Sequence, residues 1–390
     1  MKKLLLPILF AIAILNFVAC SSDDVTITDS SLITKEQVIA NYSAIVLSNY
    51  QAAYNDAVLL QSAIQELAVN PSQLSHNAAK QAWRNSRESY GTTEAFRFSS
   101  GPIDDNDGPE GLLNAWPLDE NYIDYVEGGI NAGIINDLVN YPSINKELLE
   151  SLNELGGEAN ISIGYHAIEF LLWGQDNTSP LDNQAGLRPF TDFVDGGTAE
   201  NQDRRSQYVV VCAELLLDHL QLMINEWSIG GPYYNVFIAL DEDEAIKNIL
   251  TGIATLSKSE LAGERIFVAL SNQDQEDEHS CFSDNTHRDA RLNLKGIYNV
   301  YNGTFGTISG ASLKVLVDQS NAATGTNVTN QLNAAVTDVE ATAIPFDIAI
   351  TGGVNSTEGI KVLQAVNSLQ DLGDQFVLAG TALGVIVISE

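Results

Sequence analysis

Basic residues are scarce in this 390-residue chain, which has 19 lysines and arginines against 51 aspartates and glutamates. The formal net charge of −32 argues against nucleic acid or anionic lipid as a partner, because both require a positive protein surface. Only three cysteines are present, without a CxxC motif, so a structural zinc site is not expected. The HExxH, GxSxG and phosphate-loop motifs are also missing, which removes the common signatures of zinc peptidases, serine hydrolases and P-loop nucleotide-binding proteins.

The N-terminus has the pattern of a secretory signal. Two lysines precede the apolar run Leu4–Leu15, which is too short to span a bilayer comfortably, and Cys20 follows shortly after. The residues around Cys20 resemble a bacterial lipobox, which implies removal of residues 1–19 and a lipid on the Cys20 thiol. The alternative is an ordinary signal peptide with a cysteine there by chance. Ser21–Asp24 resembles a sorting tag, so we predict an outer-membrane lipoprotein, either periplasmic or surface-exposed.

The mature chain is strongly acidic. Cleavage before Cys20 removes two lysines and no acidic residue, which leaves 17 basic against 51 acidic residues. Such a surface suits a soluble body and favours cations as ligands. The other two cysteines, Cys212 and Cys281, either form one disulfide in the oxidising envelope or stay free, and their spacing does not decide between the two.

Apolar residues recur at helical spacing along most of the chain, and strand-like alternation is scarce. Thr34–Gln37 has the pattern of a capping box, and Pro71 ends the first helical pattern. Gly325 is expected to interrupt a later helix. The expected helices span residues 34–70, 73–98, 123–128, 145–153, 161–174, 204–226, 242–270, 289–301, 311–343 and 358–383. We therefore predict an all-α fold.

Length and internal similarity suggest two helical domains. A mature chain of about 370 residues exceeds the size at which one hydrophobic core usually stops growing. We predict a flexible tether over residues 20–33, an N-terminal helical domain over 34–201 and a C-terminal helical domain over 202–390. In each half a long apolar helix is followed by one that ends in an acid–arginine pair, which suggests a duplicated helical bundle. The two pairs are Glu94/Arg97 and Glu264/Arg265.

The stretch Ile161–Gly174 is almost entirely apolar, yet it contains His166 and Glu169. At 100° per residue, a spacing of three places the imidazole and the carboxylate on one face of a helix. Burying both is costly unless they pair with each other or bind a metal. The two residues are therefore either a core ion pair or half of a metal site, and such ligands suit iron, zinc or manganese.

Two further groups of polar residues are candidates for the same site. The pairs Glu94/Arg97 and Glu264/Arg265 are either internal salt bridges or a clamp for an anion beside the metal, as for a ferric chelate. The polar run Asp274–Asp289 is either a solvated surface or a lid from the second domain that completes the site. The residues of this run that we consider as second-shell or chelate-binding groups are His279, Ser283 and Asp284.

Gly164–Glu169 matches the GxHxxE signature, and the chain resembles the imelysin family over most of its mature length. The other segments that carry this resemblance are Gly101–Asp104, Trp116–Pro117, Glu169–Asp176, Gly263–Arg265 and His279–His287. The resemblance implies a two-domain, all-helical protein of the bacterial envelope. It also implies a GxHxxE site near the domain interface and a role in iron acquisition.

The predicted function is therefore binding of iron or an iron chelate for uptake, with zinc as the alternative metal. The expected partners are the cargo, the membrane through the lipid on Cys20, and an outer-membrane transporter; nucleic acid is not expected. A metal-dependent peptidase is the alternative, because the family is named for a reported insulin-cleaving peptidase. A zinc peptidase needs three protein ligands, an open position and a general base, and the pattern offers only His166 and Glu169, so binding is favoured over catalysis.

Overall fold

Helices make up nearly all the regular structure of the computed structural model, which describes residues 32–105 and 108–389. Among these residues the strands are the short antiparallel pair β1 (Thr304–Phe305) and β2 (Ile308–Ser309). The all-α prediction is therefore confirmed. The predicted signal peptide, the lipidated Cys20 and most of the predicted tether lie outside the described residues.

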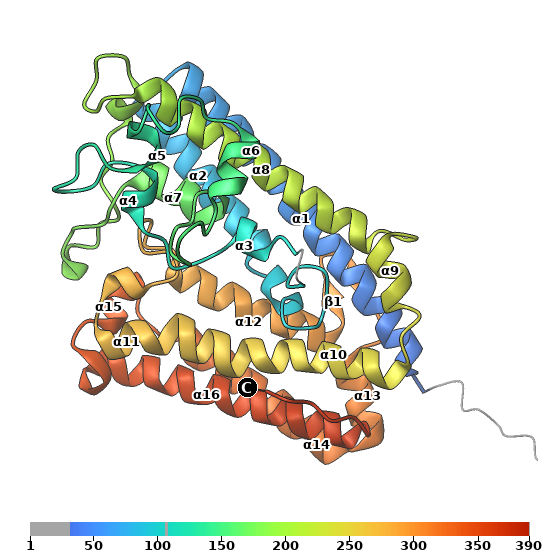
Figure 1. The fold of residues 1–390 in the computed structure, drawn as a ribbon. Helices are drawn as coiled ribbons and strands as arrows, with labels where there is room; N and C mark the ends of the chain where they lie inside the picture. The colour runs from blue at the N-terminus through green and yellow to red at the C-terminus, as the bar shows by residue number, and fades with distance from the viewer. Residues whose placement is uncertain (1–31, 106–107, 390) are drawn as a thin grey trace, which may run out of the picture. The chain divides into compact units, whose positions relative to one another are not determined.

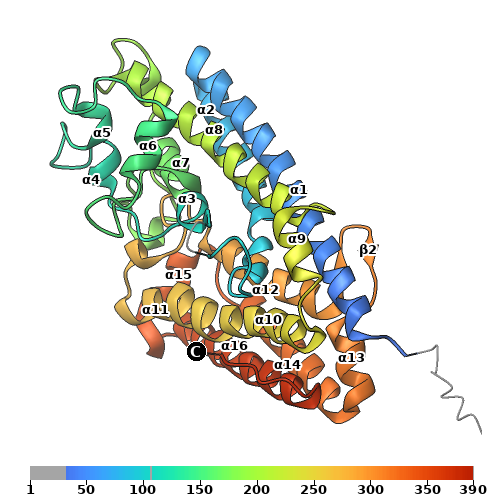
Figure 2. The ribbon, with the colours of Figure 1, turned by 45° about the vertical axis from the view of Figure 1, so that its right-hand side comes forward.

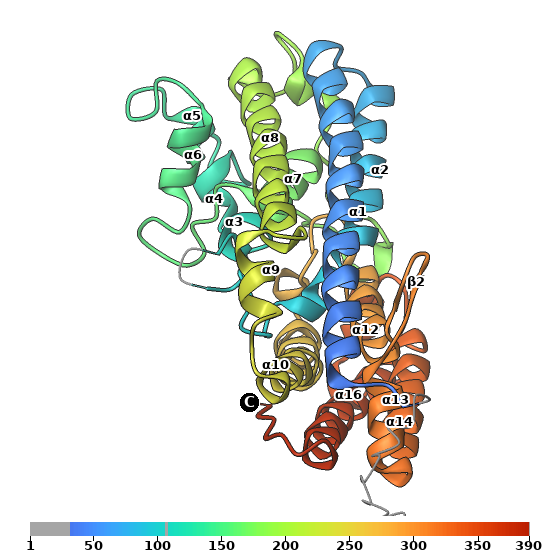
Figure 3. The same cartoon turned by 90° about the vertical axis from the view of Figure 1, so that its right-hand side faces the viewer.

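One group of helices contains the central stretch and consists of α1 (Lys35–Val69), α2 (Gln73–Tyr90), α7 (Gly164–Trp173) and α8 (Gln202–Trp227). Helix α1 begins at the predicted capping box of Thr34. It packs along both α2 and α8, and α7 packs against α8 and α2. Figures 1 and 3 show α1 and α8 side by side over much of their lengths.

Short helices and loops connect α2 to α7 and α7 to α8. The helix expected over residues 123–128 is not formed. Helix α4 lies earlier and ends at Ile123, and Val126 and Gly129 close a tight turn with each other instead. The short helices are η1 (Thr93–Phe96), α3 (Glu110–Leu113), α4 (Glu120–Ile123), α5 (Gly133–Asn136), α6 (Lys146–Leu152), η2 (Pro180–Asp182) and η3 (Phe190–Phe193).

The second half forms another group of helices, in which α16 packs against α10, η4 and α14 (Figure 2). Helix α12 packs against η4 and α14 and also reaches α2 and η1 of the first half. The elements are α9 (Pro232–Phe237), α10 (Glu242–Thr255), η4 (Leu256–Phe267), α11 (Val268–Asn272), η5 (Gln275–Asp277), α12 (Thr286–Asn302), α13 (Leu313–Ser320), α14 (Ala322–Glu340), α15 (Phe346–Ile350), η6 (Gly353–Asn355) and α16 (Thr357–Ala382).

Three of the expected helices are divided in the structure. The segment expected as one helix over residues 73–98 is α2, which ends at Tyr90, followed by the short helix η1. The segment expected as one helix over residues 242–270 is α10, the π-helix η4 and α11 in succession. The break expected near Gly325 is present and lies slightly earlier, at Asn321, between α13 and α14. The side chain of Asn321 accepts a hydrogen bond from the backbone N–H of Thr324, so it caps α14 in the way that asparagine favours.

Helix α8 follows the domain boundary predicted at residue 201, yet it packs on α1 and α7 of the first half. Residues from Ile33 onward group into one compact unit. The exact division into two domains therefore stays a prediction. The segment Gln202–Phe237 is long and apolar enough to cross a membrane, but most of its apolar window is buried inside the protein, as for a core helix.

Candidate metal centre

The GxHxxE stretch forms α7, and all ten residues of this helix are buried. It begins at Gly164, whose φ of +91° is rarely adopted by residues with a side chain. A Cβ at this position would lie 2.8 Å from the carbonyl oxygen of Leu113. The indole N–H of Trp83 donates to the carbonyl oxygen of Tyr165 at 2.9 Å, which ties α7 to α2. These contacts hold the following turn of the helix in place.

His166 and Glu169 contact each other on one face of α7, in agreement with their spacing. Nδ1 of His166 lies 3.0 Å from Oε2 of Glu169. The other carboxylate oxygen, Oε1, accepts hydrogen bonds from the backbone N–H of Ser283 at 3.0 Å and from its hydroxyl at 2.7 Å. Both oxygens of Glu169 are therefore occupied, whereas Nε2 of His166 is buried without a hydrogen-bond partner.

His279 repeats this arrangement from the second half of the chain. Its Nδ1 lies 2.9 Å from Oδ2 of Asp289, and Arg87 contacts the other oxygen of that carboxylate at 3.1 Å. The rings of His166 and His279 meet edge to face, with their centroids 4.7 Å apart and their planes at 76°. The indole of Trp116 lies beside His166, with the ring centroids 5.1 Å apart. Packing between the two halves thus places two imidazoles together.

Burial keeps both imidazoles in their neutral form at neutral pH. It lowers the pKa of His166 well below the usual value, and the nearby His279 and Arg87 act in the same direction. The pKa of His279 is also lowered, first by burial and then by the charge of Arg265. A neutral imidazole that donates its Nδ1 proton to a carboxylate presents the lone pair of Nε2 to a ligand.

The pKa values of the two carboxylates shift in opposite directions, because their charged neighbours differ. Burial raises the pKa of Glu169 to about 8, although the hydrogen bonds from Ser283 oppose this rise. Burial would also raise the pKa of Asp289, but Arg87 and His279 outweigh it and hold this pKa below its usual range. Asp289 is therefore ionised at neutral pH and accepts the Nδ1 proton of His279, whereas Glu169 is mostly protonated at pH 7 and donates to Nδ1 of His166. A ligand at Nε2 of His166 then requires Glu169 to give up this proton, so that the ring proton can lie on Nδ1.

A row of ion pairs connects the two halves beside the histidines. Nη2 of Arg265 lies 2.6 Å from Oε2 of Glu94 and 2.8 Å from Oε1 of Glu260. Nη1 of Arg97 lies 3.1 Å from the same oxygen of Glu260 and 3.3 Å from Oε1 of Glu110. Of the predicted acid–arginine residues, Glu94, Arg97 and Arg265 therefore belong to one network, and each arginine in it already contacts at least two carboxylates.

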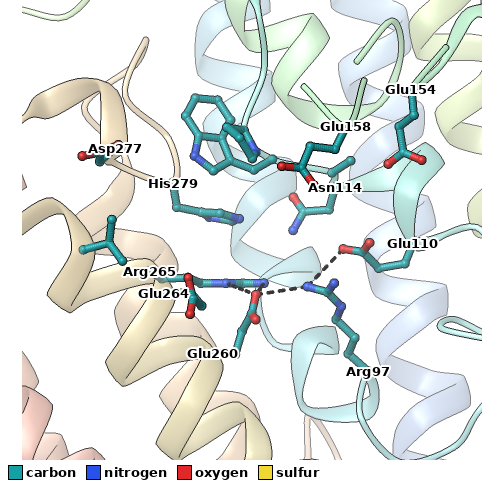
Figure 4. A pocket seen from close by; sticks show the side chains of 14 residues that line it. Arg97, Glu110, Asn114, Glu154, Glu158, Glu260, Glu264, Arg265, Asp277 and His279 are labelled. Carbon is teal, nitrogen blue, oxygen red and sulfur yellow. Dashed lines mark hydrogen bonds and ion pairs between the residues drawn. The ribbon is translucent and has the colours of Figure 1, made fainter. Parts of the chain in front are cut away.

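A cavity of about 500 Å³ opens beside His279 and this network (Figure 4). The imidazole of His279 points into it, between Asp277 on one side and Asn114 on the other. Glu264, the remaining member of the predicted pairs, is exposed at the wall of the cavity and does not pair with Arg265. The cavity connects the surface to His279 and thereby to the neighbourhood of His166.

The residues predicted from the polar run separate in the structure. Ser283 joins the site through Glu169, whereas the carboxylate of Asp284 lies with Asp347 and Asp176 and faces another cavity, of about 590 Å³. Burial, with these two acids nearby, raises the pKa of Asp284 to about 8. Across residues 32–105 and 108–389, no three or more histidine, cysteine, aspartate or glutamate side chains are grouped to hold a metal ion.

Both remaining cysteines, Cys212 and Cys281, are buried and free, so the disulfide that the sequence left open is not formed. Burial raises the pKa of each thiol above its usual value. The thiolate form, which binds metals, is therefore disfavoured at both positions.

A model of a protein family described as imelysin matches residues 46–376, which is most of the chain. The chain belongs to the imelysin family. It is 24% identical over 283 residues to iron-regulated protein A of Synechococcus elongatus, an alignment that covers 70% of this chain and 65% of that relative. The chain thus spans about two thirds of the relative's length.

The imelysin fold is also found in a crystal structure described as an iron-regulated protein A precursor from Parabacteroides distasonis. That structure has a TM-score of 0.67 and 19% sequence identity, and the match covers 91% of this chain and 97% of the other. At this identity the likeness establishes the fold.

Sequence reasoning did not single out several residues of this imelysin site. Asp289 orients His279, and Arg87 bridges Asp289 to Asn114, whose Oδ1 lies 2.5 Å from Nη1 of Arg87. Glu260 joins the two arginines of the network. In the sequence these residues look like the many other polar and charged residues of helical segments, and nothing there identifies the partner of each side chain.

Proposed function

We propose that this chain is a lipoprotein of the cell envelope that binds iron at the imidazoles of His166 and His279 during iron uptake. The observation that carries this proposal is the pair of buried imidazoles with ring centroids 4.7 Å apart. In each of them Nδ1 is held by a carboxylate, so that Nε2 is left as the ligand atom. Histidines that bind metals in proteins are commonly oriented by such a carboxylate.

The donor set fits a transition metal. Imidazole nitrogen suits iron, zinc or copper better than calcium or magnesium, which prefer oxygen ligands. The buried Nε2 of His166, which lacks a hydrogen-bond partner, is the kind of polar atom that a metal would satisfy. Iron is preferred among these metals because the two relatives reported above are named as iron-regulated proteins.

In this proposal Glu169 positions the ligand rather than binding the metal itself. Its Oε2 contacts Nδ1 of His166, and its Oε1 contacts both hydrogen-bond donors of Ser283. The metal then has two protein ligands and open positions for water or for groups carried by the cargo. A site of this kind suits a cargo that is later released more than a metal that stabilises the fold.

The cellular location rests on the N-terminal pattern. The name of the Parabacteroides distasonis protein as a precursor agrees with a secreted or envelope protein. Cleavage before Cys20 and lipid on its thiol would place the imelysin domain at the outer membrane, where an outer-membrane transporter is the proposed receiver of the iron.

Metal analysis and calorimetry of the purified protein test the proposal. Protein prepared without chelators should contain iron, and titration with ferrous, ferric or zinc ion should show one site. That site should be lost in His166→Ala and weakened by tenfold or more in His279→Ala. His219→Ala is the matched control, because His219 pairs with Glu150 outside the site and should bind metal like the parent.

Parent-like titrations of His166→Ala and His279→Ala would overturn the assignment and leave the two histidines as core groups. The same preparations also address the alternative activity. Cleavage of a peptide substrate by the parent, abolished in His166→Ala and retained in His219→Ala, would assign the site to a metal-dependent peptidase instead.

A further inference from the structure

The cavity beside His279 is strongly acidic. Its wall includes two basic side chains, those of Arg97 and Arg265. The acidic side chains of the wall are Glu110, Glu154, Glu158, Glu260, Glu264 and Asp277. Burial raises the pKa of Glu110 to about 7, so this residue is about half ionised at neutral pH. Even so, carboxylates clearly outnumber guanidinium groups around the cavity.

The two arginines offer little attraction to an anion, because their charges are already neutralised within the protein. Arg265 is 6% exposed and contacts Glu94 and Glu260. Arg97 contacts Glu260 and Glu110. An anionic ligand would have to displace one of these carboxylates, and the displaced buried acid would then lose its partner. The arginines are therefore structural counter-charges rather than an anion clamp.

Four other carboxylates surround the cavity without such compensation. Glu154, Glu158 and Glu264 are exposed, Asp277 is half-buried, and none of them forms an ion pair with a residue that the structure describes. In Figure 4, Asp277 and Glu264 lie on one side of the cavity and Glu154 and Glu158 on the other. They come from separate segments: the loop after α6, the π-helix η4 and the short helix η5.

His279 indicates that this acidic cavity leads to a ligand rather than being only a solvated surface. The histidine is 4% exposed, its Nδ1 is held by Asp289, and its ring points into the cavity. A neutral imidazole with its Nε2 lone pair free is an acceptor for a metal cation, not for an anion. The imidazole nitrogen and the surrounding negative charge therefore both favour a positively charged ligand.

We propose that this cavity receives the cargo as a hydrated metal cation and excludes anionic metal chelates. The proposal rests on the proposed function and specifies the class of ligand. A cleft lined by charges of one sign focuses the electric field, raises the local concentration of counter-ions and increases their association rate about 10- to 1,000-fold. The same field repels a chelate such as ferric citrate, whose carboxylates would approach the four unpaired acids.

Stopped-flow and calorimetric measurements on the whole mature chain test this selection, with ferrous ion under anaerobic conditions and ferric citrate as the two probes. Trp116, on the cavity wall and beside His166, supplies the fluorescence signal. Ferrous ion should bind the parent, with an association rate that falls about tenfold between low and high ionic strength. Ferric citrate should not bind.

The triple variant Glu154→Gln/Glu158→Gln/Glu264→Gln should bind ferrous ion about tenfold more slowly, with a weaker dependence on salt, and should gain affinity for ferric citrate. The control Glu147→Gln/Glu200→Gln/Asp371→Asn removes the same charge from exposed positions away from the cavity and should behave like the parent. Circular dichroism should show all variants folded, because the substituted side chains are exposed.

Equal binding of ferric citrate and ferrous ion by the parent would overturn the proposal, as would an unchanged ferrous association rate in the triple variant. The variant His166→Ala separates this failure from failure of the proposed function. If it binds ferrous ion like the parent, the metal site itself is misassigned. If it loses ferrous binding while the parent also takes ferric citrate, the site stands and only the selection by charge is wrong.

Discussion

At the scale of single residues, each defined position of the GxHxxE signature has a different structural role, which the sequence motif alone does not show. Gly164 allows the helix to begin against the backbone of Leu113, His166 presents an unpaired nitrogen, and Glu169 holds the other nitrogen of the ring. Ser283 in turn holds Glu169 through two hydrogen bonds. A substitution at Glu169 should therefore act on the metal through His166.

Glu169→Gln is expected to weaken metal binding 10- to 100-fold while the protein stays folded. Its amide oxygen would keep the hydrogen bonds from Ser283, so its NH₂ group would face Nδ1 of His166. Nδ1 must then accept, and the ring proton moves to Nε2, where it blocks the ligand lone pair. Nitrogen NMR of His166 above pH 8, where Glu169 of the parent is ionised, should report the changed tautomer, and parent-like metal affinity would contradict this role for Glu169.

A second residue-scale prediction concerns His76, which packs against the far end of α7. Its Nε2 lies 2.8 Å from the carbonyl oxygen of Leu172, and burial, aided by the charge of Lys80, lowers its pKa to about 4. Between about pH 6.5 and pH 4 the unfolded chain binds a proton that the folded chain does not, so stability should fall as the pH falls through this window.

The expected loss is on the order of 3 kcal/mol, and His76 contributes no further loss below pH 4. Denaturant unfolding of the parent and of His76→Gln at several pH values measures it. The variant should show a shallower decline across this window; an identical decline in both proteins would show that His76 is not the source.

At the scale of elements, the π-helix η4 places Glu260 and Arg265 on one face. Residues five apart lie about 140° from each other around an α-helix, too far for their side chains to pair. In η4, Nε of Arg265 lies 3.0 Å from Oε1 of Glu260. The wider turn also directs Arg265 to Glu94 on η1, so the two halves are tied by an ion pair next to the cavity.

Glu94→Gln should destabilise the protein by about 3–5 kcal/mol, because it leaves the buried Arg265 without its closest counter-charge. Glu260→Gln should cost less, since Glu260 is partly exposed and water can replace it. Glu264→Gln, at an exposed position, is the control and should change the free energy of unfolding by less than about 0.5 kcal/mol. Urea unfolding measures the free energy of unfolding of all three variants. If Glu94→Gln lost no more stability than the control, the Arg265–Glu94 ion pair would not be what holds the two halves together.

At the scale of the whole molecule, the site belongs to neither half alone. The first half contributes His166 and Glu169, and the second contributes His279, Asp289 and Ser283. Helix α12, which carries Asp289, packs against α2 and η1 of the first half. Metal bound between the halves should therefore raise the free energy of unfolding of the whole protein. Above the dissociation constant, this increase should grow with the logarithm of the metal concentration.

The membrane anchor is the remaining whole-molecule prediction. If Cys20 is lipidated, mass spectrometry of the mature N-terminus should show a diacylglyceryl-cysteine, and Cys20→Ala should release the protein from membranes. The reason is that the acidic mature surface has no other expected attraction to anionic lipid. A mature N-terminus at any other residue would show that this prediction is wrong.

The sequence by itself determined the helical fold class, the capping box of α1, the family, and the contact of His166 with Glu169, because each depends on local spacing or on a short motif. The sequence did not reveal the π-helix η4, because the spacing of its apolar residues does not distinguish a π-helix from an α-helix.

Only the tertiary structure decided which distant side chains meet. His279 was one polar candidate in an acidic run, and packing placed its ring against that of His166 while Asp284 went to other acids. Packing likewise assigned Arg265 to Glu94 and Glu260 and left Glu264 exposed at the cavity. The physical reason is that the identity of a charged residue does not specify which residue far away in the sequence will pair with it. Their pairing is settled by the geometry with which whole helices bury their apolar faces.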